Sequence, residues 1–245
     1  MNKYLKIYKH HGGGLRGLWR DIDTFKEVDL FDIIHKGINT RTIKTDGYQN
    51  NQYMWYAPVY TSVSLEMIRL SLDYFASAIR YTNFHRKIVF VDLGCGSGKT
   101  IIQAHETNLF DFCGGVEIDL GLKNLVDKNL SKLFPDEHNR IFTIHGNVEE
   151  EGWLLEIKEL LIKNGISPSM VTIFIFNKNS YAASVLDKSL KIVEKTFSSF
   201  IYLYQNPIHH KVLLENNYQC FLEDSKPNNF HKNYKYKCYL KHKSD

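Results

Sequence analysis

The stretch VFVDLGCGSGKT at residues 89–100 contains the residue types and spacing that most clearly indicate chemistry. Gly94, Gly96 and Gly98 alternate with other residues, and Asp92 stands just before them. Glycine lets a backbone approach a ligand closely, and a glycine-rich turn between a strand and a helix is a common nucleotide site. The pattern therefore predicts a nucleotide-type ligand at the tip of a strand.

The ending GSGKT also matches part of a P-loop, the turn that binds triphosphates in many nucleotide hydrolases. A P-loop requires Gly-x-x-x-x-Gly-Lys-Ser/Thr, and its first glycine falls on Leu93 here. Asp92 would in addition set a carboxylate against a phosphate, and like charges repel. We therefore expect Lys99 and Thr100 only to begin the next helix.

An acidic residue, Glu117, ends the next predicted strand, 19 residues after Gly98. Dinucleotide-binding folds place an acid at this point, where it binds ribose hydroxyls. NAD and S-adenosylmethionine both satisfy that geometry. Asp92 discriminates between them, because its carboxylate attracts the cationic amino and sulfonium groups of S-adenosylmethionine and repels a pyrophosphate. The sequence therefore favours S-adenosylmethionine as the cofactor.

From residue 87 onward, apolar strand-like segments alternate with amphipathic helix-like segments. The strands are predicted at 87–94, 112–119, 140–147, 169–177 and 199–207, the helices at 99–108, 121–134, 147–165, 179–197 and 209–217, and two final strands at 218–224 and 232–243. This order predicts an α/β fold with a Rossmann-like, doubly wound, mostly parallel seven-stranded sheet and a C-terminal antiparallel hairpin. The alternating lysines of the last strand fit a solvated edge strand.

Residues 1–86 have a different character and form a separate N-terminal segment in our prediction. They contain one clear amphipathic helix at 61–80, which follows a stretch rich in turn residues and aromatics. We expect a mainly helical cap that lies over the carboxyl edge of the sheet and selects the substrate, with the cofactor-binding domain at 87–245. Tyr60 and Thr61 are predicted to face the cofactor.

The bulk properties exclude several classes of protein. The net charge of +4 is small and gives no strong reason to expect a nucleic-acid partner. The sequence contains no run of about 18 apolar residues, which is the length that a membrane-spanning helix needs. The four cysteines form no CxxC pair, no motif calls for a metal, and we expect a cytoplasmic protein with free thiols. The sequence gives no indication of the oligomeric state.

VDLGCGSG resembles the first motif of the class I S-adenosylmethionine-dependent methyltransferases, and GVEID resembles their second. HGN at 145–147 stands where a third motif contacts the adenine, which implies that role for Asn147. FNKNSY at 176–181 occupies the place of the fourth motif, which implies that Asn177 and Tyr181 belong to the active site. Many relatives have Asn-Pro-Pro-Tyr there, and the missing prolines argue against amino methylation of DNA bases.

A wider set of segments, HKGINTR, YAP, FVDLGCGSGK, GVEI, FNKNSY and YLYQNP, is similar to a group of bacterial methyltransferases often encoded beside sugar or surface-glycan genes. That resemblance implies methyl transfer to a hydroxyl or amine of a sugar, a surface-glycan precursor or a small metabolite. His209, after the fifth strand, is a candidate general base, because histidine titrates near neutrality. Two alternatives remain open. A shorter similarity to non-SET histone lysine methyltransferases suggests a protein acceptor, and the altered fourth motif allows a catalytically inactive cofactor-binding protein.

Overall fold

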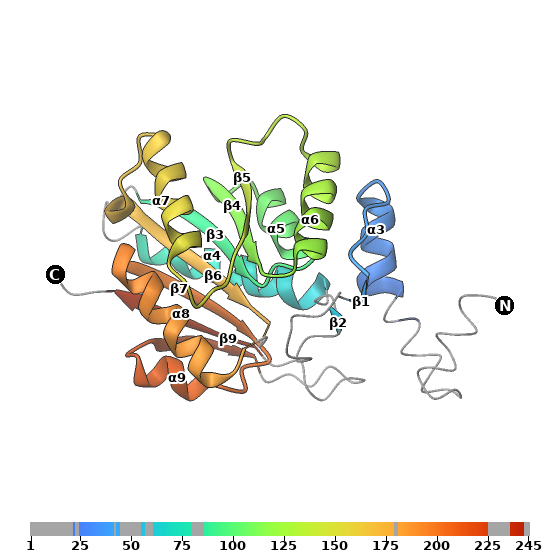
Figure 1. Ribbon diagram of the computed structural model, residues 1–245. Coiled ribbons are helices and arrows are strands. Elements are labelled where there is room, and N and C mark those ends of the chain that lie inside the picture. The colour runs from blue at the N-terminus through green and yellow to red at the C-terminus, as the bar shows by residue number, and fades with distance from the viewer. Residues whose placement is uncertain are drawn as a thin grey trace.

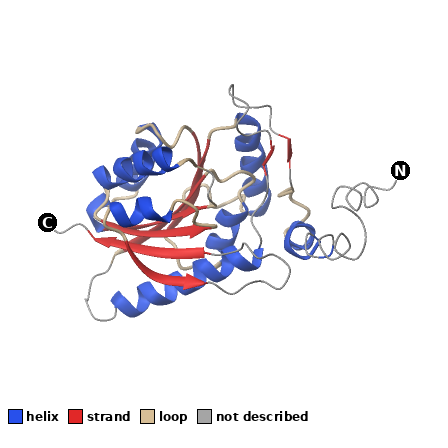
Figure 2. Ribbon diagram, turned by 90° about the horizontal axis from the view of Figure 1, so that it is seen from below, coloured by secondary structure: helices blue, strands red, loops and turns tan. Residues whose placement is uncertain are grey.

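The computed structural model describes residue 22 and residues 25–41, 43–44, 55–56, 61–79, 86–178, 181–224 and 236–242. Figure 1 shows three layers, in which a central sheet is covered by helices on both faces, and Figure 2 shows the same arrangement from below. The sheet has seven strands in the order β5-β4-β3-β6-β7-β9-β8. The predicted doubly wound, mostly parallel sheet is therefore confirmed.

The described helices and strands follow the predicted alternation from β3 onward. The strands are β1 (Ile43–Lys44), β2 (Trp55–Tyr56), β3 (Lys87–Leu93), β4 (Phe112–Glu117), β5 (Ile141–His145), β6 (Val171–Asn177), β7 (Ser199–Gln205), β8 (Gln219–Asp224) and β9 (Tyr236–His242). The helices are η1 (Phe25–Asp29), α3 (Leu30–Ile34), α4 (Thr61–Ile79), α5 (Lys99–Glu106), α6 (Leu120–Leu133), α7 (Gly152–Lys163), η2 (Pro168–Met170), α8 (Ala183–Thr196) and α9 (His210–Glu215).

The central strands β3, β6 and β7 have mainly apolar, buried middle segments, and both of their faces are covered. Successive side chains of a strand point to opposite faces, so Val89 and Val91 pack with α7 and α8 while Phe90 packs with α5 and α6. Strands buried in this way read as continuous apolar runs, which is the pattern that the sequence shows.

Helix α4 covers a face of the sheet beside α5, which differs from the expected cap over the carboxyl edge. Its buried side chains include Met67, Ile68, Leu72 and Phe75, and they share one core cluster with strands β3, β6 and β7. Phe75 meets Phe174 of β6 edge to face, with ring centroids 5.3 Å apart. The helix therefore completes the layer of α5 and α6, because the half of that face over β7 and β9 would otherwise be bare.

The C-terminal hairpin confirms the predicted antiparallel pair, but its lysine-rich strand is not an edge strand. Strand β9 lies between β7 and β8 and pairs antiparallel with both. Its lysines pair with acids, Lys237 with Glu223 at 3.1 Å and Lys241 with Glu194 at 2.8 Å. The edge-strand interpretation was therefore wrong, because the alternating lysines reflect ion pairing around a buried strand.

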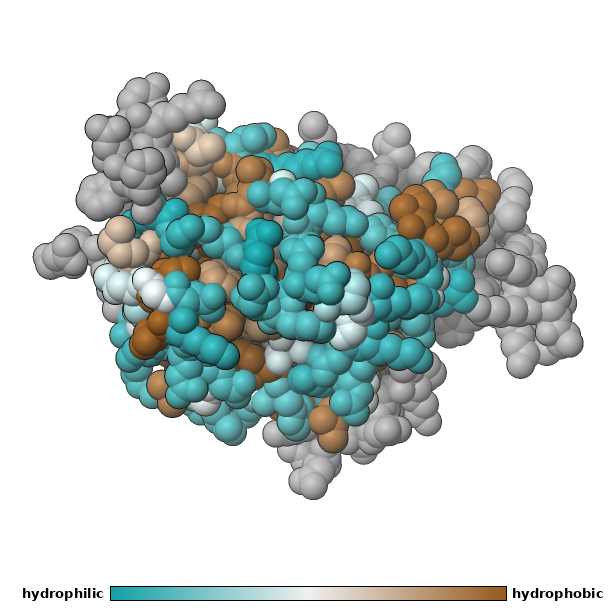
Figure 3. Space-filling model, turned by 90° about the horizontal axis from the view of Figure 1, so that it is seen from above, coloured by the Kyte–Doolittle hydropathy of each residue, from teal (hydrophilic) through white to brown (hydrophobic). Residues whose placement is uncertain are grey.

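The surface is mainly hydrophilic in the view of Figure 3, with several brown areas, one of which lies on the side of the molecule where α3 lies. Helix α3 exposes Leu30, Ile33 and Ile34. In the part of the chain that the structure describes, no helix has the length and apolar character needed to cross a bilayer.

Candidate functional site

The topology places a switch point at the carboxyl ends of β3 and β6, and the region just outside these strand ends is called the crevice here. From β3 the chain continues outward through β4 to β5, and then returns to β6 on the other side of β3. Asp92 of β3 lies opposite Phe176 of β6 in the parallel register. Ligands of open α/β sheets bind at such a switch point, outside the carboxyl ends of the strands. The glycine turn follows β3 directly at this point.

All three glycines of the turn have left-handed backbone conformations, with φ of +78° at Gly94, +54° at Gly96 and +85° at Gly98. The turn is tied to the neighbouring strand, because the N–H of Gly94 donates to the carbonyl of Val116 at 2.8 Å. A Cβ on Gly98 would lie 2.4 Å from Cγ2 of Val126 in α6. The first two glycines therefore shape the turn, and the third also lets α6 pack closely against it.

The carboxylate of Asp92 is buried at the start of the turn. It accepts a hydrogen bond from the hydroxyl of Thr100, in the first turn of α5. The pKa of Asp92 is raised to about 7, mainly by burial and also by the neighbouring carboxylate of Glu117, while the Thr100 hydrogen bond and Lys178 act in the opposite direction. A buried carboxylate with this pKa gains stability when a cationic group binds beside it.

Glu117 fixes the middle of the turn from the end of β4. Its two carboxylate oxygens accept from the backbone N–H groups of Gly96 at 2.8 Å and Asp119 at 2.9 Å. Burial raises the pKa of Glu117, and these two hydrogen bonds oppose that rise. Each carboxylate oxygen can accept a second bond, so the group keeps the capacity to bind a pair of hydroxyls.

Lys99 points away from the place where a P-loop lysine would meet a phosphate. Its side chain is buried, Nζ donates to the backbone carbonyl of Glu27 in η1, and it lies 4.9 Å from the centroid of the Phe31 ring. Burial lowers the pKa of Lys99 to about 8. The lysine of the GSGKT ending therefore contributes to the packing of η1 against α5. Lys99 and Thr100 begin helix α5, as the sequence predicted.

Asn177 and Tyr181 lie at the same end of the sheet as Asp92. Asn177 closes β6 with a buried side chain beside the phenol of Tyr202. Tyr181 is half-buried and precedes α8, so it is not a helix residue. Burial raises the pKa of Tyr181 well above its usual range, and the charges of Glu117 and Asp92 raise it further. The predicted fourth-motif residues therefore share one crevice with the acids.

Lys178 also belongs to this crevice, and the sequence reasoning did not single it out as a site residue. Burial lowers its pKa to about 8, and the carboxylate of Asp92 opposes that effect. Gln205 is a second such residue. It ends β7 with a fully buried side chain, and neither its Nε2 nor its Oε1 has a hydrogen-bond partner in the described chain. The position of Gln205 at the end of a strand was the feature of the sequence that could have indicated a site residue.

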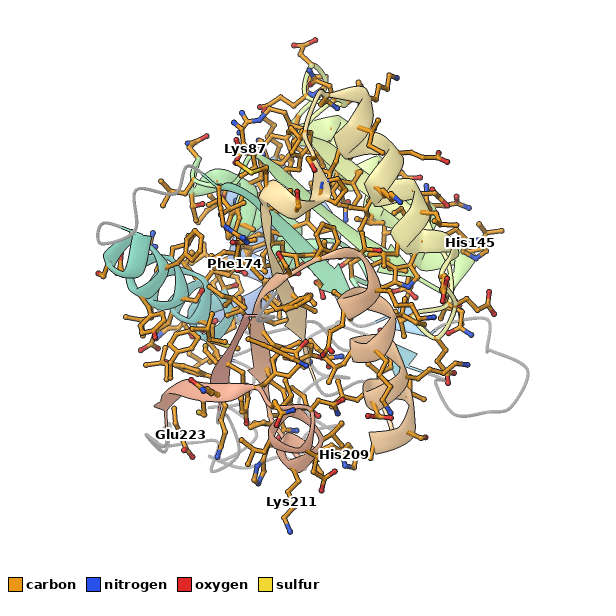
Figure 4. All side chains as sticks on the ribbon, turned by 90° about the vertical axis from the view of Figure 1, so that its left-hand side faces the viewer. Lys87, His145, Phe174, His209, Lys211 and Glu223 are labelled. Atoms are coloured by element: carbon orange, nitrogen blue, oxygen red, sulfur yellow. The ribbon has the colours of Figure 1, made fainter. Side chains whose placement is uncertain are left out.

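The described contacts of Asn147 and of the histidines are made with residues other than Asp92, Asn177 and Tyr181. Asn147 stabilises its own turn, with Oδ1 accepting from the N–H of Glu149 at 3.1 Å. The exposed His145 contacts the carbonyl of Ile118 through Nε2 at 3.0 Å. His209 stands before α9, where its N–H donates to the Tyr204 hydroxyl at 3.4 Å. Figure 4 shows His145 and His209 well apart, which argues against a shared role.

Thr61 begins α4, and its hydroxyl faces η1. The hydroxyl donates to the carbonyl of Glu27 at 2.6 Å, and the Thr61 carbonyl accepts from Nε2 of Gln103 at 2.8 Å. The helix is capped by a distant residue, because the carboxylate of Glu27 accepts from the N–H of Ser62 at 2.9 Å. Tyr60, the other predicted cofactor contact on this segment, lies outside the described residues.

A comparison with solved structures finds several to which this chain is similar. The TrmK protein of M. capricolum, solved in complex with S-adenosyl-homocysteine, is 18% identical over 65% of this chain and 63% of its own, with a TM-score of 0.46. The alignment thus spans less than two thirds of that protein's length. A ribosomal protein L11 methylase from Lactobacillus delbrueckii subsp. bulgaricus is 14% identical over 82% and 83%, with a TM-score of 0.46.

A precorrin-6y C5,15-methyltransferase from Geobacter metallireducens is 14% identical over 84% of this chain and 100% of its own, with a TM-score of 0.44. No family model matches the sequence. No curated protein matches it either. The function proposed below therefore rests on the side chains of the site and not on these similarities.

Proposed function

We propose that this protein binds S-adenosylmethionine at the glycine turn and transfers its methyl group to an acceptor. The observation that carries the proposal is the pair of buried carboxylates around three left-handed glycines at the switch point of the sheet. Asp92 would hold a cationic group and Glu117 would accept from ribose hydroxyls, two needs that S-adenosylmethionine meets together. A pyrophosphate would meet the charge of Asp92 and find Lys99 turned away.

When bound, the cofactor supplies a methyl group on a sulfonium, which an oxygen or nitrogen nucleophile attacks in line. The protein contributes orientation and exclusion of water, because holding two reactants in line removes much of the entropic barrier. We propose that Asn177 and Tyr181 position the acceptor, since both lie at the carboxyl end of β6 beside Asp92. Both are uncharged hydrogen-bonding groups, which supports a hydroxyl or amine of a sugar, a glycan precursor or a small metabolite.

A hydroxyl acceptor must also lose its proton. Lys178 follows Asn177 directly, and its pKa of about 8 leaves a fraction of the amine neutral near physiological pH. His209 stands instead at the start of α9 and contacts Tyr204. We therefore propose Lys178 ahead of the predicted His209 as the group that takes the proton.

Calorimetric titration with S-adenosylmethionine, S-adenosyl-homocysteine, NAD and ATP tests the cofactor. We expect binding of the first two alone, and Asp92→Asn should weaken S-adenosylmethionine by about 10- to 100-fold, since a charged hydrogen bond contributes about 1.5–3 kcal/mol. Asp136→Asn is the matched control, because Asp136 is exposed. Tight binding of NAD or ATP in place of the methyl donor would refute the proposal. Donor binding without transfer to any acceptor would instead favour an inactive cofactor-binding protein.

A further inference from the structure

Segment 25–41 contains η1, α3 and the loop after them. Two buried side chains connect it to the glycine turn by hydrogen bonds. The first is Asn129 of α6. Its Nδ2 donates to the carbonyl of Ser97 in the turn at 3.0 Å and to the carbonyl of Asn39 at 2.9 Å. Its Oδ1 accepts from the N–H of Asn39 at 3.2 Å. One amide thus joins the turn and the loop.

The second tie is Lys99, the first residue of α5 and the neighbour of Gly98. Its buried ammonium group donates to the carbonyl of Glu27 and lies over the ring of Phe31. The carboxylate of Glu27 in turn caps α4 through Ser62, with distances of 2.9 Å to its N–H and 2.8 Å to its hydroxyl. The two ties therefore hold both ends of segment 25–41 against residues 97–99.

Segment 25–41 is itself held in one conformation by its own contacts. The buried carboxylate of Asp32 accepts from the N–H of Thr40 at 3.1 Å and from its hydroxyl at 2.6 Å. Arg41 pairs with Asp29 through Nε at 2.8 Å. The segment can therefore act as a firm support, because a contact transmits position only when its own partners are fixed.

We propose that segment 25–41 is a clamp that positions the glycine turn for the methyl donor, with Asn129 and Lys99 as its positioning residues. A turn of three left-handed glycines loses much conformational entropy when it is ordered, and an external support removes that cost from the binding step. Coupling between two sites is reciprocal, so donor binding must also stabilise the docked clamp. This inference rests on the proposed cofactor.

Hydrogen exchange of the full-length protein with and without S-adenosyl-homocysteine tests the coupling without any substitution. We expect the ligand to slow exchange of the backbone amides at 94–98 and also at Asn39 and Thr40, which lie behind the turn. Protection confined to residues that can touch the ligand would overturn the clamp.

Asn129→Leu removes the first tie, which consists of three hydrogen bonds of the amide, while keeping a similar volume. Lys99→Met removes the second tie. We expect each to weaken S-adenosyl-homocysteine binding about tenfold, within the usual range of coupling between sites, and to abolish the added protection at Asn39. Asn216→Leu is the matched control. Its amide makes two hydrogen bonds, to Asp187 at 2.9 Å and Val212 at 2.8 Å, and it lies beside α8 and α9, away from the glycine turn.

The control should lose stability to a similar degree and bind S-adenosyl-homocysteine with unchanged affinity. If Asn129→Leu behaves like Asn216→Leu in both respects, Asn129 is only structural and the clamp is refuted. If the unaltered protein binds no S-adenosyl-homocysteine, the proposed cofactor is wrong and the clamp falls with it, so the two failures are distinguishable.

Discussion

Gly98→Ala tests whether the third glycine is required by close packing as well as by backbone conformation. The substitution places an L-residue at a φ of +85°, which costs about 1–2 kcal/mol. It also brings a Cβ to 2.4 Å from Cγ2 of the buried Val126, where ordinary contact begins at 3.4 Å. Overpacking of this kind costs about 1–3 kcal/mol. We therefore expect the free energy of unfolding to fall by about 2–5 kcal/mol.

Gly165→Ala separates the two contributions. Gly165 also has a positive φ, +73°, but a Cβ there would meet nothing within 4 Å. Only the conformational cost of about 1–2 kcal/mol applies to it. The assay is urea unfolding followed by tryptophan fluorescence, with the midpoint and the slope fitted for each variant.

Val126→Ala completes a double-mutant cycle with Gly98→Ala. The smaller side chain creates a cavity on its own, but it makes room for the new Cβ in the double variant. We expect the double variant to be more stable than the sum of the single effects predicts, by about 1–3 kcal/mol. Equal costs for the two glycine substitutions, or a cycle additive within about 0.5 kcal/mol, would refute the packing argument.

Four further predictions follow from the buried polar groups of the crevice. Because the pKa of Asp92 is about 7, its carboxylate takes up a proton below that pH. The affinity for S-adenosylmethionine should therefore fall by up to about tenfold per pH unit below pH 7. An unchanged affinity in calorimetry at pH 5.5 and pH 8 would contradict this. Without ligand, the raised pKa of Asp92 means that the native state binds a proton more tightly than the unfolded chain does. The contribution of Asp92 to the free energy of unfolding should therefore fall as the pH rises from about 4 to 7. The urea midpoints of the unaltered protein and of Asp92→Asn should diverge over that pH range. Glu117→Gln places an amide where the carboxylate accepts from the N–H groups of Gly96 and Asp119. The substitution should lower the free energy of unfolding by about 1–3 kcal/mol. It should also lower the affinity for S-adenosylmethionine in the same calorimetric titrations. Gln205→Met removes a buried amide that has no hydrogen-bond partner in the described chain. The substitution should raise the free energy of unfolding by about 1–3 kcal/mol. A loss of stability would show that the amide makes hydrogen bonds in solution.

The parts of the fold and site that the sequence predicted depend on local patterns. Strand β3 has an apolar run at 88–91 and is followed by the glycines of the turn, so both its burial and the turn after it follow from adjacent residues. Glu117 was found because the end of the second strand is a fixed position in a doubly wound sheet. Asn177 and Tyr181 reached the same crevice for a similar reason, since β6 must lie beside β3 at the switch point.

The parts that the sequence did not predict depend on contacts between distant residues. Glu27 caps α4 although it lies 35 residues before Ser62, so the usual search for a neighbouring cap residue cannot find it. Asn129 looks like an ordinary polar residue of α6 until Ser97 and Asn39 are brought to either side of it. The ion pairs of β9 were hidden too, because its lysines indicate a solvent-facing strand until their acidic partners are known.

The most direct test of the central claim is a crystal structure of the protein with S-adenosyl-homocysteine bound. The account predicts the ribose hydroxyls on the carboxylate of Glu117, the amino group of the ligand beside Asp92, and the turn at 94–98 against it. It also predicts that Lys99 stays on the carbonyl of Glu27. A ligand bound elsewhere, or a crevice in which Asp92 and Glu117 contact no part of the ligand, would contradict the account.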